Sequence, residues 1–179
     1  MNAEENLTFD GDVLTVGTKL NVGTNYPITG TLSSIAGGLN NTASTSYGFI
    51  GSGVRNELSQ SGASGIVAGA DNSIKAYGTN ANASCNFIGS GQLNNIAAHG
   101  DSISLNFNAI VGGYDNAISS SNGSHRNIIG GGDENLICNA SYGGILGGDN
   151  NSITRGYSII GGGIRNKADG LGSVVEAGS

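Results

Sequence analysis

Apolar positions recur along this chain in a fixed pattern with glycine and asparagine. The pattern is Ile-x-[Gly/Ser/Ala]-Gly-x-x-Asn-x-[Ile/Leu/Ala], and eight repeats start 15 to 22 residues apart. Repetition at so short a period is typical of solenoids, in which each unit buries its apolar face by stacking on the next. The repeated residues are Ile35, Ile50, Ile66, Ile88, Ile110, Ile129, Ile145 and Ile160, with Asn41, Asn56, Asn72, Asn94, Asn116, Asn135, Asn151 and Asn166.

Each repeat predicts two short β-strands. One strand surrounds the isoleucine, a glycine turn follows, and a second strand follows the asparagine. Glycine permits the positive φ of a tight corner, and asparagine tolerates it better than most residues. No 3.6-residue period persists, which argues against helices. The sequence predicts an all-β, parallel β-solenoid (β-roll) of eight to nine short coils, the ninth beginning at Val175.

Three repeats are longer than the others, at 22, 22 and 19 residues. Their extra residues fall in the segments that return to the next isoleucine, for example 79–84 and 101–106. Insertions in repeat proteins map to loops on one face. We therefore expect exposed loops on one side of the solenoid.

The residues that flank each isoleucine alternate in size. Where the preceding residue is large, as at Phe49 or Ile128, the following one is glycine; where it is small, as at Gly65, the following one is Ala, Val or Leu. In a strand these two positions share the face opposite the isoleucine. The pattern predicts a second apolar face with staggered bulky groups, buried along the shared axis of a rotationally symmetric oligomer. We expect a homotrimer.

Residues 1–34 lack the repeat and read as a separate unit. Short alternating apolar runs surround Gly11 and Gly17, and Pro27 marks the transition. Bare solenoid edges invite further strand pairing, so terminal caps are expected. We assign 1–34 to an N-terminal β cap or connector and 35–179 to the solenoid.

Composition excludes several classes of protein. The chain has 33 Gly, one Pro, no Trp and 11% charged residues, and its net charge is −6. Phosphate-binding surfaces need clustered Lys and Arg, so no nucleic-acid partner is expected. No apolar run approaches the ~20 residues that span a bilayer, and no signal peptide follows Met1. We expect no membrane insertion.

Local motifs for chemistry are weak. The residues after the glycine turns include carboxylates of the kind that structural calcium binds (Asp115, Asp133, Glu134 and Asp149), but several repeats lack them, which favours solvated turn residues over a calcium site. His99 and His125 lie in return segments without a catalytic partner nearby in sequence, so we predict no enzyme and no cofactor.

Cys85 and Cys138 are expected to be small buried residues. Threonines form no regular array of the kind that ice binding requires.

The repeats resemble those of a known group of proteins. The segments NFIGSGQLNNIAAHG (86–100) and SIIGGGIRNKADG (158–170) are similar to head repeats of trimeric autotransporter adhesins, and more closely to Gly-Gly-x-x-Asn repeats of phage tail fibres. The resemblance covers residues 35–179. It implies left-handed parallel β-rolls that trimerise and present an attachment surface. The stretch NLTFDGDVLTV (6–16) resembles strand units that lead into phage fibre modules.

Two functions remain open at this point. The first is a structural fibre module of a virion tail fibre or a cell-surface appendage, joined to other fibre or virion proteins at its termini. The second is attachment to a host receptor or glycan, either by a phage fibre or by a bacterial adhesin head. A polysaccharide-degrading tail spike is a distant third. The candidate receptor contacts in the long return segments are Tyr77, His99, Phe107, Asn122 and His125.

Overall fold

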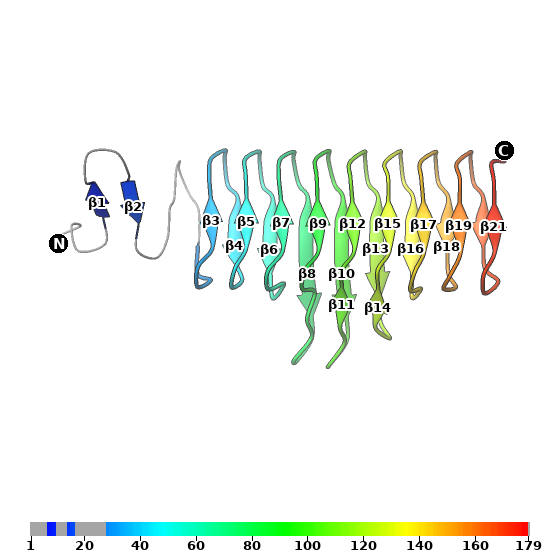
Figure 1. The fold of residues 1–179 in the computed structure, drawn as a ribbon, viewed down its shortest axis with the longest axis horizontal. Helices are drawn as coiled ribbons and strands as arrows, with labels where there is room; N and C mark the ends of the chain where they lie inside the picture. Colours follow the sequence, from blue (N-terminus) through cyan, green and yellow to red (C-terminus); the bar gives the residue numbers. More distant parts are fainter. Residues whose placement is uncertain (1–6, 10–13, 17–27, 179) are drawn as a thin grey trace.

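The computed structural model describes residues 7–9, 14–16 and 28–178, and every regular element among them is a β-strand. From residue 28 onward the chain winds into an elongated stack of coils (Figure 1). The predicted all-β, parallel β-solenoid is confirmed. Within the described residues no helix is long and apolar enough to cross a membrane.

The repeated isoleucines build one parallel sheet of nine strands, which we call the first sheet. Each strand pairs with its equivalents one coil before and after, so the isoleucines form a continuous column. The strands are β3 (Ser34–Ile35), β5 (Phe49–Ile50), β7 (Gly65–Ile66), β9 (Phe87–Ile88), β12 (Ala109–Ile110), β15 (Ile128–Ile129), β17 (Gly144–Ile145), β19 (Ile159–Ile160) and β21 (Val174–Val175).

The strands that follow the repeated asparagines build a second parallel sheet of eight strands. Its register places the small apolar residue of each repeat over that of the next, as at Ile118 and Ile137. The strands are β4 (Thr42–Ser44), β6 (Glu57–Ser59), β8 (Ser73–Tyr77), β10 (Asn95–His99), β13 (Ala117–Ser120), β16 (Leu136–Cys138), β18 (Ser152–Ile153) and β20 (Lys167–Ala168).

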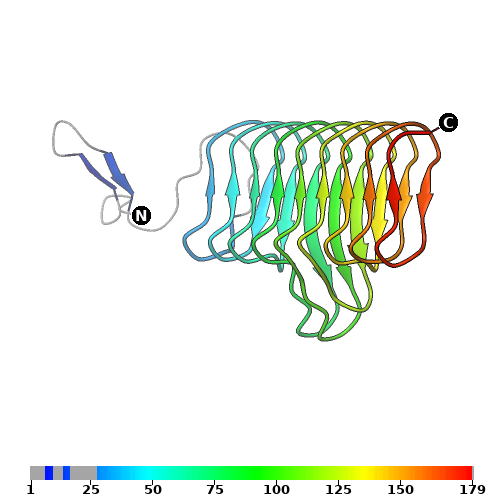
Figure 2. The same cartoon turned by 45° about the vertical axis from the view of Figure 1, so that its right-hand side comes forward.

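The two sheets enclose a single narrow core. All eight repeated isoleucines are fully buried, and they pack against the small apolar column of the second sheet. Figure 2 shows the coils lying almost directly over one another. A narrow coil contributes few apolar side chains, so backbone pairing between coils carries much of the cohesion.

Each coil turns its corners with left-handed backbone. Gly113 has a φ of 96°, and the residue before each repeated asparagine has a φ of 50–61°. The expectation that the asparagine itself takes the positive φ is wrong. The preceding residue takes it whatever its type, as at Arg55, Leu93 and Glu134. Bulky residues adopt this region at a cost, so the neighbouring coils must impose the conformation.

The three long repeats form a projecting flap rather than separate loops. Strands β8, β10 and β13 run past the narrow coils, and β11 (Leu105–Asn106) pairs in parallel with β14 (Ser124–His125). In Figures 1 and 2 the flap hangs below the middle of the stack. It has its own buried residues, including Ala83, Ala98 and Leu105. The flap is therefore a local widening of the solenoid with an extended core.

Part of the predicted cap falls outside the described residues, at 1–6, 10–13 and 17–27. Strand β1 (Leu7–Phe9) pairs antiparallel with β2 (Leu14–Val16). Solenoid stacking begins before Ile35, because Ile28 forms a parallel bridge with Ala43 and the Thr29 N–H donates to the Ala43 carbonyl. Residues 28–34 thus lie against the first complete coil.

Candidate functional site

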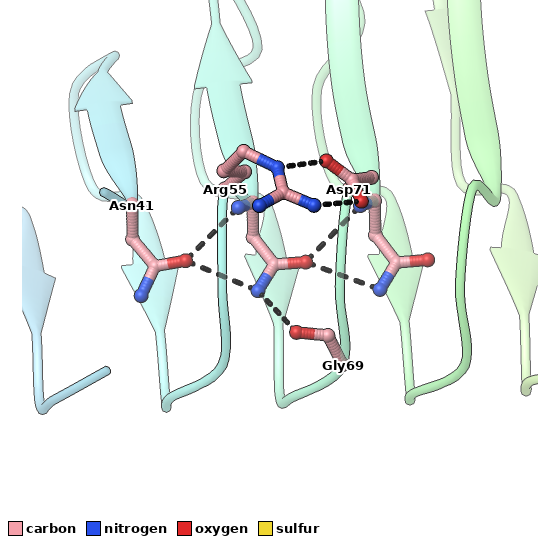
Figure 3. A network of polar contacts seen from close by, with 6 residues as sticks. Asn41, Arg55, Gly69 and Asp71 are labelled. Atoms are coloured by element: carbon pink, nitrogen blue, oxygen red, sulfur yellow. Dashed lines mark hydrogen bonds and ion pairs between the residues drawn. The ribbon is translucent and has the colours of Figure 1, made fainter. Parts of the chain in front are cut away.

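The repeated asparagines form a hydrogen-bonded ladder inside the solenoid. The side-chain Nδ2 of Asn56 donates to Oδ1 of Asn41 at 3.1 Å, and the Asn56 backbone N–H donates to the same oxygen at 2.9 Å (Figure 3). Nδ2 also donates to the carbonyl of Gly69 in the next coil at 2.9 Å. The same bonds recur up to Asn166. The ladder satisfies buried polar groups at this corner of every coil.

A second ladder lies at the opposite corner, two residues before each isoleucine. Nδ2 of Asn108 donates to Oδ1 of Asn86 at 3.0 Å, and Nδ2 of Asn127 donates to Oδ1 of Asn108 at 3.0 Å. In narrow coils Ser64 or Ser158 accepts the equivalent backbone N–H. Sequence reasoning missed this ladder. The available signal was that this position always holds Ser, Asn or Gly.

The outer face of the first sheet is an exposed apolar surface, which we call the staggered face. Its bulky side chains are 44–64% exposed. They alternate between two columns from coil to coil, because Phe49 pairs with Gly65 and Gly65 with Phe87. The residues are Phe49, Val67, Phe87, Val111, Ile128, Leu146 and Ile159.

Glycines in the staggered face have two distinct roles. A Cβ added at Gly144 would lie 3.8 Å from Ile128 and 3.9 Å from Ile159, so this glycine leaves a gap between bulky neighbours. A Cβ added at Gly130 would lie 2.4 Å from the carbonyl oxygen of Leu146. Glycine is therefore required at position 130 because the backbones of adjacent coils approach closely there. The size alternation seen in the sequence is a second reason for it.

The outer face of the second sheet has the opposite character. Its outward positions are mostly Ser, Thr, Asn and charged residues, and Lys75 pairs with Glu57 at 2.6 Å between coils. Ser73 Oγ donates to Asn95 Oδ1 at 2.9 Å. One broad side of the solenoid is thus suited to water, while the other presents a long apolar strip. Contiguous apolar strips of this kind mark interaction surfaces.

The flap carries most of the predicted receptor contacts. The rings of Tyr77 and His99 stack with centroids 5.0 Å apart, and both side chains are exposed. Asn122 is exposed beside Ser120, whose Oγ donates to its Oδ1 at 3.1 Å. His125 is half-buried, and its Nδ1 accepts the Asn106 N–H at 3.4 Å. The structure therefore brings Tyr77 and His99 together but does not join the other candidates to them.

Phe107 belongs to a different cluster at the corner between the two sheets. The Arg126 guanidinium carbon lies 5.5 Å from the ring centroids of both Phe107 and Tyr142. Arg126 Nη1 donates to the Tyr142 hydroxyl at 3.1 Å, and Tyr142 stacks on Tyr157 at 4.8 Å. Sequence reasoning missed this stack. The available signal was an aromatic or Arg residue three positions before four consecutive isoleucines.

A shallow polar hollow of about 520 Å³ lies beside the flap. Narrow-coil residues such as Ser44 and Gln60 line one part of it, and Asn80 and Asn82 from the first projecting segment line another. Hydroxyl and amide groups dominate its lining. Such a surface can exchange hydrogen bonds with hydroxyl-rich ligands.

Acidic, histidine and cysteine side chains are spread over several coils within residues 7–9, 14–16 and 28–178. No three His, Cys, Asp or Glu side chains lie there in an arrangement that could hold a metal ion. The acids after the glycine turns are exposed at one corner, and Cys138 is half-buried. Cys85 is exposed, so its predicted burial is wrong.

Arg55 and Asp71 form a bidentate ion pair between neighbouring coils, at 2.6 and 2.7 Å (Figure 3). The hydrogen bond from Arg55, with its charge, lowers the pKa of the Asp71 carboxyl below the ordinary value of 3.8. The pair is exposed, so it contributes little to stability. It ties the corner residues of two coils together.

Comparison with models of known protein families and with curated proteins gives no match for this chain.

Proposed function

We propose that this chain is a structural module of a homotrimeric fibre, part of a phage tail fibre or a similar extracellular appendage. The observation that carries the proposal is the staggered face. It runs along the solenoid opposite a polar face, and its seven bulky residues are 44–64% exposed in a single chain. A rotationally symmetric assembly would bury this strip along the shared axis.

A second copy of the same chain is the partner that best fits this face. Its bulky groups change column at every coil, as from Phe87 to Val111 to Ile128. A surface that fills the gaps must present its own bulky groups at the same coil spacing. An identical chain has that spacing by construction, which favours self-association over an unrelated partner.

The experiment compares two variants by sedimentation velocity. Phe87→Ser with Ile128→Ser makes the staggered face polar, and we expect a monomer with an unchanged β-type circular dichroism spectrum. The control, Ser73→Ala with Asn95→Ala, alters the opposite face and should stay trimeric. An oligomer that survives the first pair of changes would remove this face as the interface.

Receptor attachment through the flap is the second candidate function. It is favoured by the projection of the flap from the stack and by the exposed Tyr77–His99 ring pair on it. The polar hollow lined in part by Asn80 and Asn82 adds hydrogen-bonding groups. A phage fibre and a bacterial adhesin head could both use such a surface. Alanine at Tyr77 and His99 should abolish attachment to host cells while the oligomer mass stays unchanged. Unaltered attachment would leave the flap as a spacer.

A further inference from the structure

Two edges flank the staggered face along its whole length, and all of their sixteen residues except Val54 and Ala70 are exposed. The leading edge consists of the residue three positions before each isoleucine, and from Tyr47 onward the backbone N–H of these residues donates to a carbonyl of the preceding coil. The trailing edge is four residues after each isoleucine, joined by parallel bridges. The leading edge is Leu32, Tyr47, Ala63, Cys85, Phe107, Arg126, Tyr142 and Tyr157, and the trailing edge is Leu39, Val54, Ala70, Gln92, Tyr114, Asp133, Asp149 and Ile164.

The two edges match each other in size or in opposite charge in six of the eight coils. Large apolar residues occupy both edges of four coils, and alanine occupies both edges of the Ile66 coil. The arginine of the leading edge belongs to the same coil as an aspartate of the trailing edge. The pairs are Leu32 with Leu39, Tyr47 with Val54, Ala63 with Ala70, Cys85 with Gln92, Phe107 with Tyr114, Arg126 with Asp133, Tyr142 with Asp149 and Tyr157 with Ile164.

Paired residues lie on opposite sides of the staggered face of their own coil. Rotation about an axis parallel to the stack keeps every coil at its own height. Three flat faces around such an axis form a triangular prism, and each vertex joins the leading edge of one chain to the trailing edge of the next. The matched residues then meet between chains at the same coil level.

Charge supports this arrangement at the Ile129 coil. Arg126 is held outward between two aromatic rings, and Asp133 with Glu134 beside it is exposed. The ion pairs among the described residues join Arg55 to Asp71, Lys75 to Glu57 and Lys167 to Asp169. Neither Arg126 nor Asp133 takes part in them, so both charges are available to a neighbouring chain.

We propose that each chain sets its leading edge against the trailing edge of the next chain at the same coil level, with Arg126 paired to Asp133 of the neighbour. This register rests on the proposed self-association and specifies which residues of neighbouring chains meet. The bulky pairs and the alanine pair fix the axial position. A shift by one coil in one direction would bring Arg126 to Tyr114. A shift in the other direction would bring Arg126 to Asp149, but it would set Phe107 against Asp133 and Ala63 against Gln92.

A disulfide between chains tests the register directly. Cys85 is already on the leading edge, and Gln92→Cys adds a thiol to the trailing edge of the same coil, in a Cys138→Ser background. Disulfides need Cα atoms within about 7 Å, and coils are about 4.8 Å apart. The controls, Val54→Cys and Asp149→Cys, lie two and three coils away, about 10 and 14 Å out of register. Of the three cysteine variants, only Gln92→Cys should give covalent trimers on mild oxidation.

Non-reducing gels and light scattering on the same samples separate the outcomes. A trimer that cross-links through either control position would overturn the register while leaving the assembly intact. A trimer without any cross-link would overturn the edge-to-edge contact. A monomer would remove the assembly itself, and the proposed register with it.

Charge exchange provides a second test. Arg126→Asp or Asp133→Arg alone should raise the trimer dissociation constant by about tenfold, because like charges then face each other. The double exchange should recover most of that affinity. Arg155→Asp, which changes an exposed arginine outside both edges, is the matched control. Failure of the double exchange to recover any affinity would contradict the pairing.

Discussion

Nδ2 of Asn135 donates to Oδ1 of Asn116 at 3.0 Å, and the Asn135 backbone N–H donates to the same oxygen at 3.1 Å. One carboxamide oxygen therefore accepts two hydrogen bonds from the next coil. Both asparagines are fully buried, so losing either side chain leaves polar groups without partners and without water. Each such bond connects consecutive repeats, here through residues 19 positions apart.

Adjacent asparagines allow this ladder to be tested within one coil. Asn151 is buried in the ladder, whereas Asn150 is exposed at the corner with a φ of 55°. Asn151→Ala should lower the free energy of unfolding by about 2–4 kcal/mol, because several buried groups lose their partners. Asn150→Gly keeps the left-handed backbone and should change it by less than about 1 kcal/mol. Urea denaturation measures both, and equal effects would contradict the ladder's role.

Close approach of adjacent coils predicts different outcomes for two glycines. Gly130→Ala should lower the free energy of unfolding by about 1–3 kcal/mol, because its Cβ would lie 2.4 Å from the Leu146 carbonyl oxygen. A Cβ at Gly147 meets nothing within 4 Å, so Gly147→Ala is the control and should melt like the parent. Thermal melts under conditions that keep the chain monomeric make the comparison. A Gly130→Ala chain of parental stability would show that the backbones can separate.

The extended core of the flap predicts a local effect. Leu105→Ala should cost about 2–4 kcal/mol, because the leucine is fully buried. Hydrogen exchange should rise in 76–86 and 98–108 and stay low in the narrow coils. Phe107→Ala removes an exposed neighbour and serves as the control. Uniform acceleration across the whole chain would mean that the flap does not open separately.

The Arg55–Asp71 pair predicts a small acid dependence. The pKa of Asp71 is lower in the folded chain than its ordinary 3.8. The pair therefore stabilises the fold above that ordinary value, and its contribution is lost as the pH falls through the lowered pKa. The parent should melt at a higher temperature than Arg55→Gln at about pH 7, and the two melting temperatures should converge at about pH 2. Arg165→Gln, at the same position of another coil, should show no such convergence.

The sequence predicts the narrow coils well because each repeats the same physical constraints. Ile110 must fill the coil, Gly113 must turn the corner, and Asn116 must satisfy its polar groups. The alternation of large residues with glycine likewise indicates a second apolar face. These features recur eight times, so the pattern of residue types is enough to identify them.

The flap and the corners are harder to infer because their residues follow no repeated pattern. Leu105 occupies a position that the narrow coils lack, and its burial depends on the stacking of three long segments. Left-handed corners accept Arg55 as readily as Asn150, since the neighbouring coils determine the backbone there. The Arg126 stack depends on columns that align residues 15 to 19 positions apart.

The proposed assembly is tested most directly by the solution mass of the unmodified chain. Light scattering over a range of concentrations should give a mass near three times 17.8 kDa. That result would agree with a staggered face buried along a threefold axis. A mass of 17.8 kDa at every concentration would contradict self-association and leave the apolar strip for a different partner.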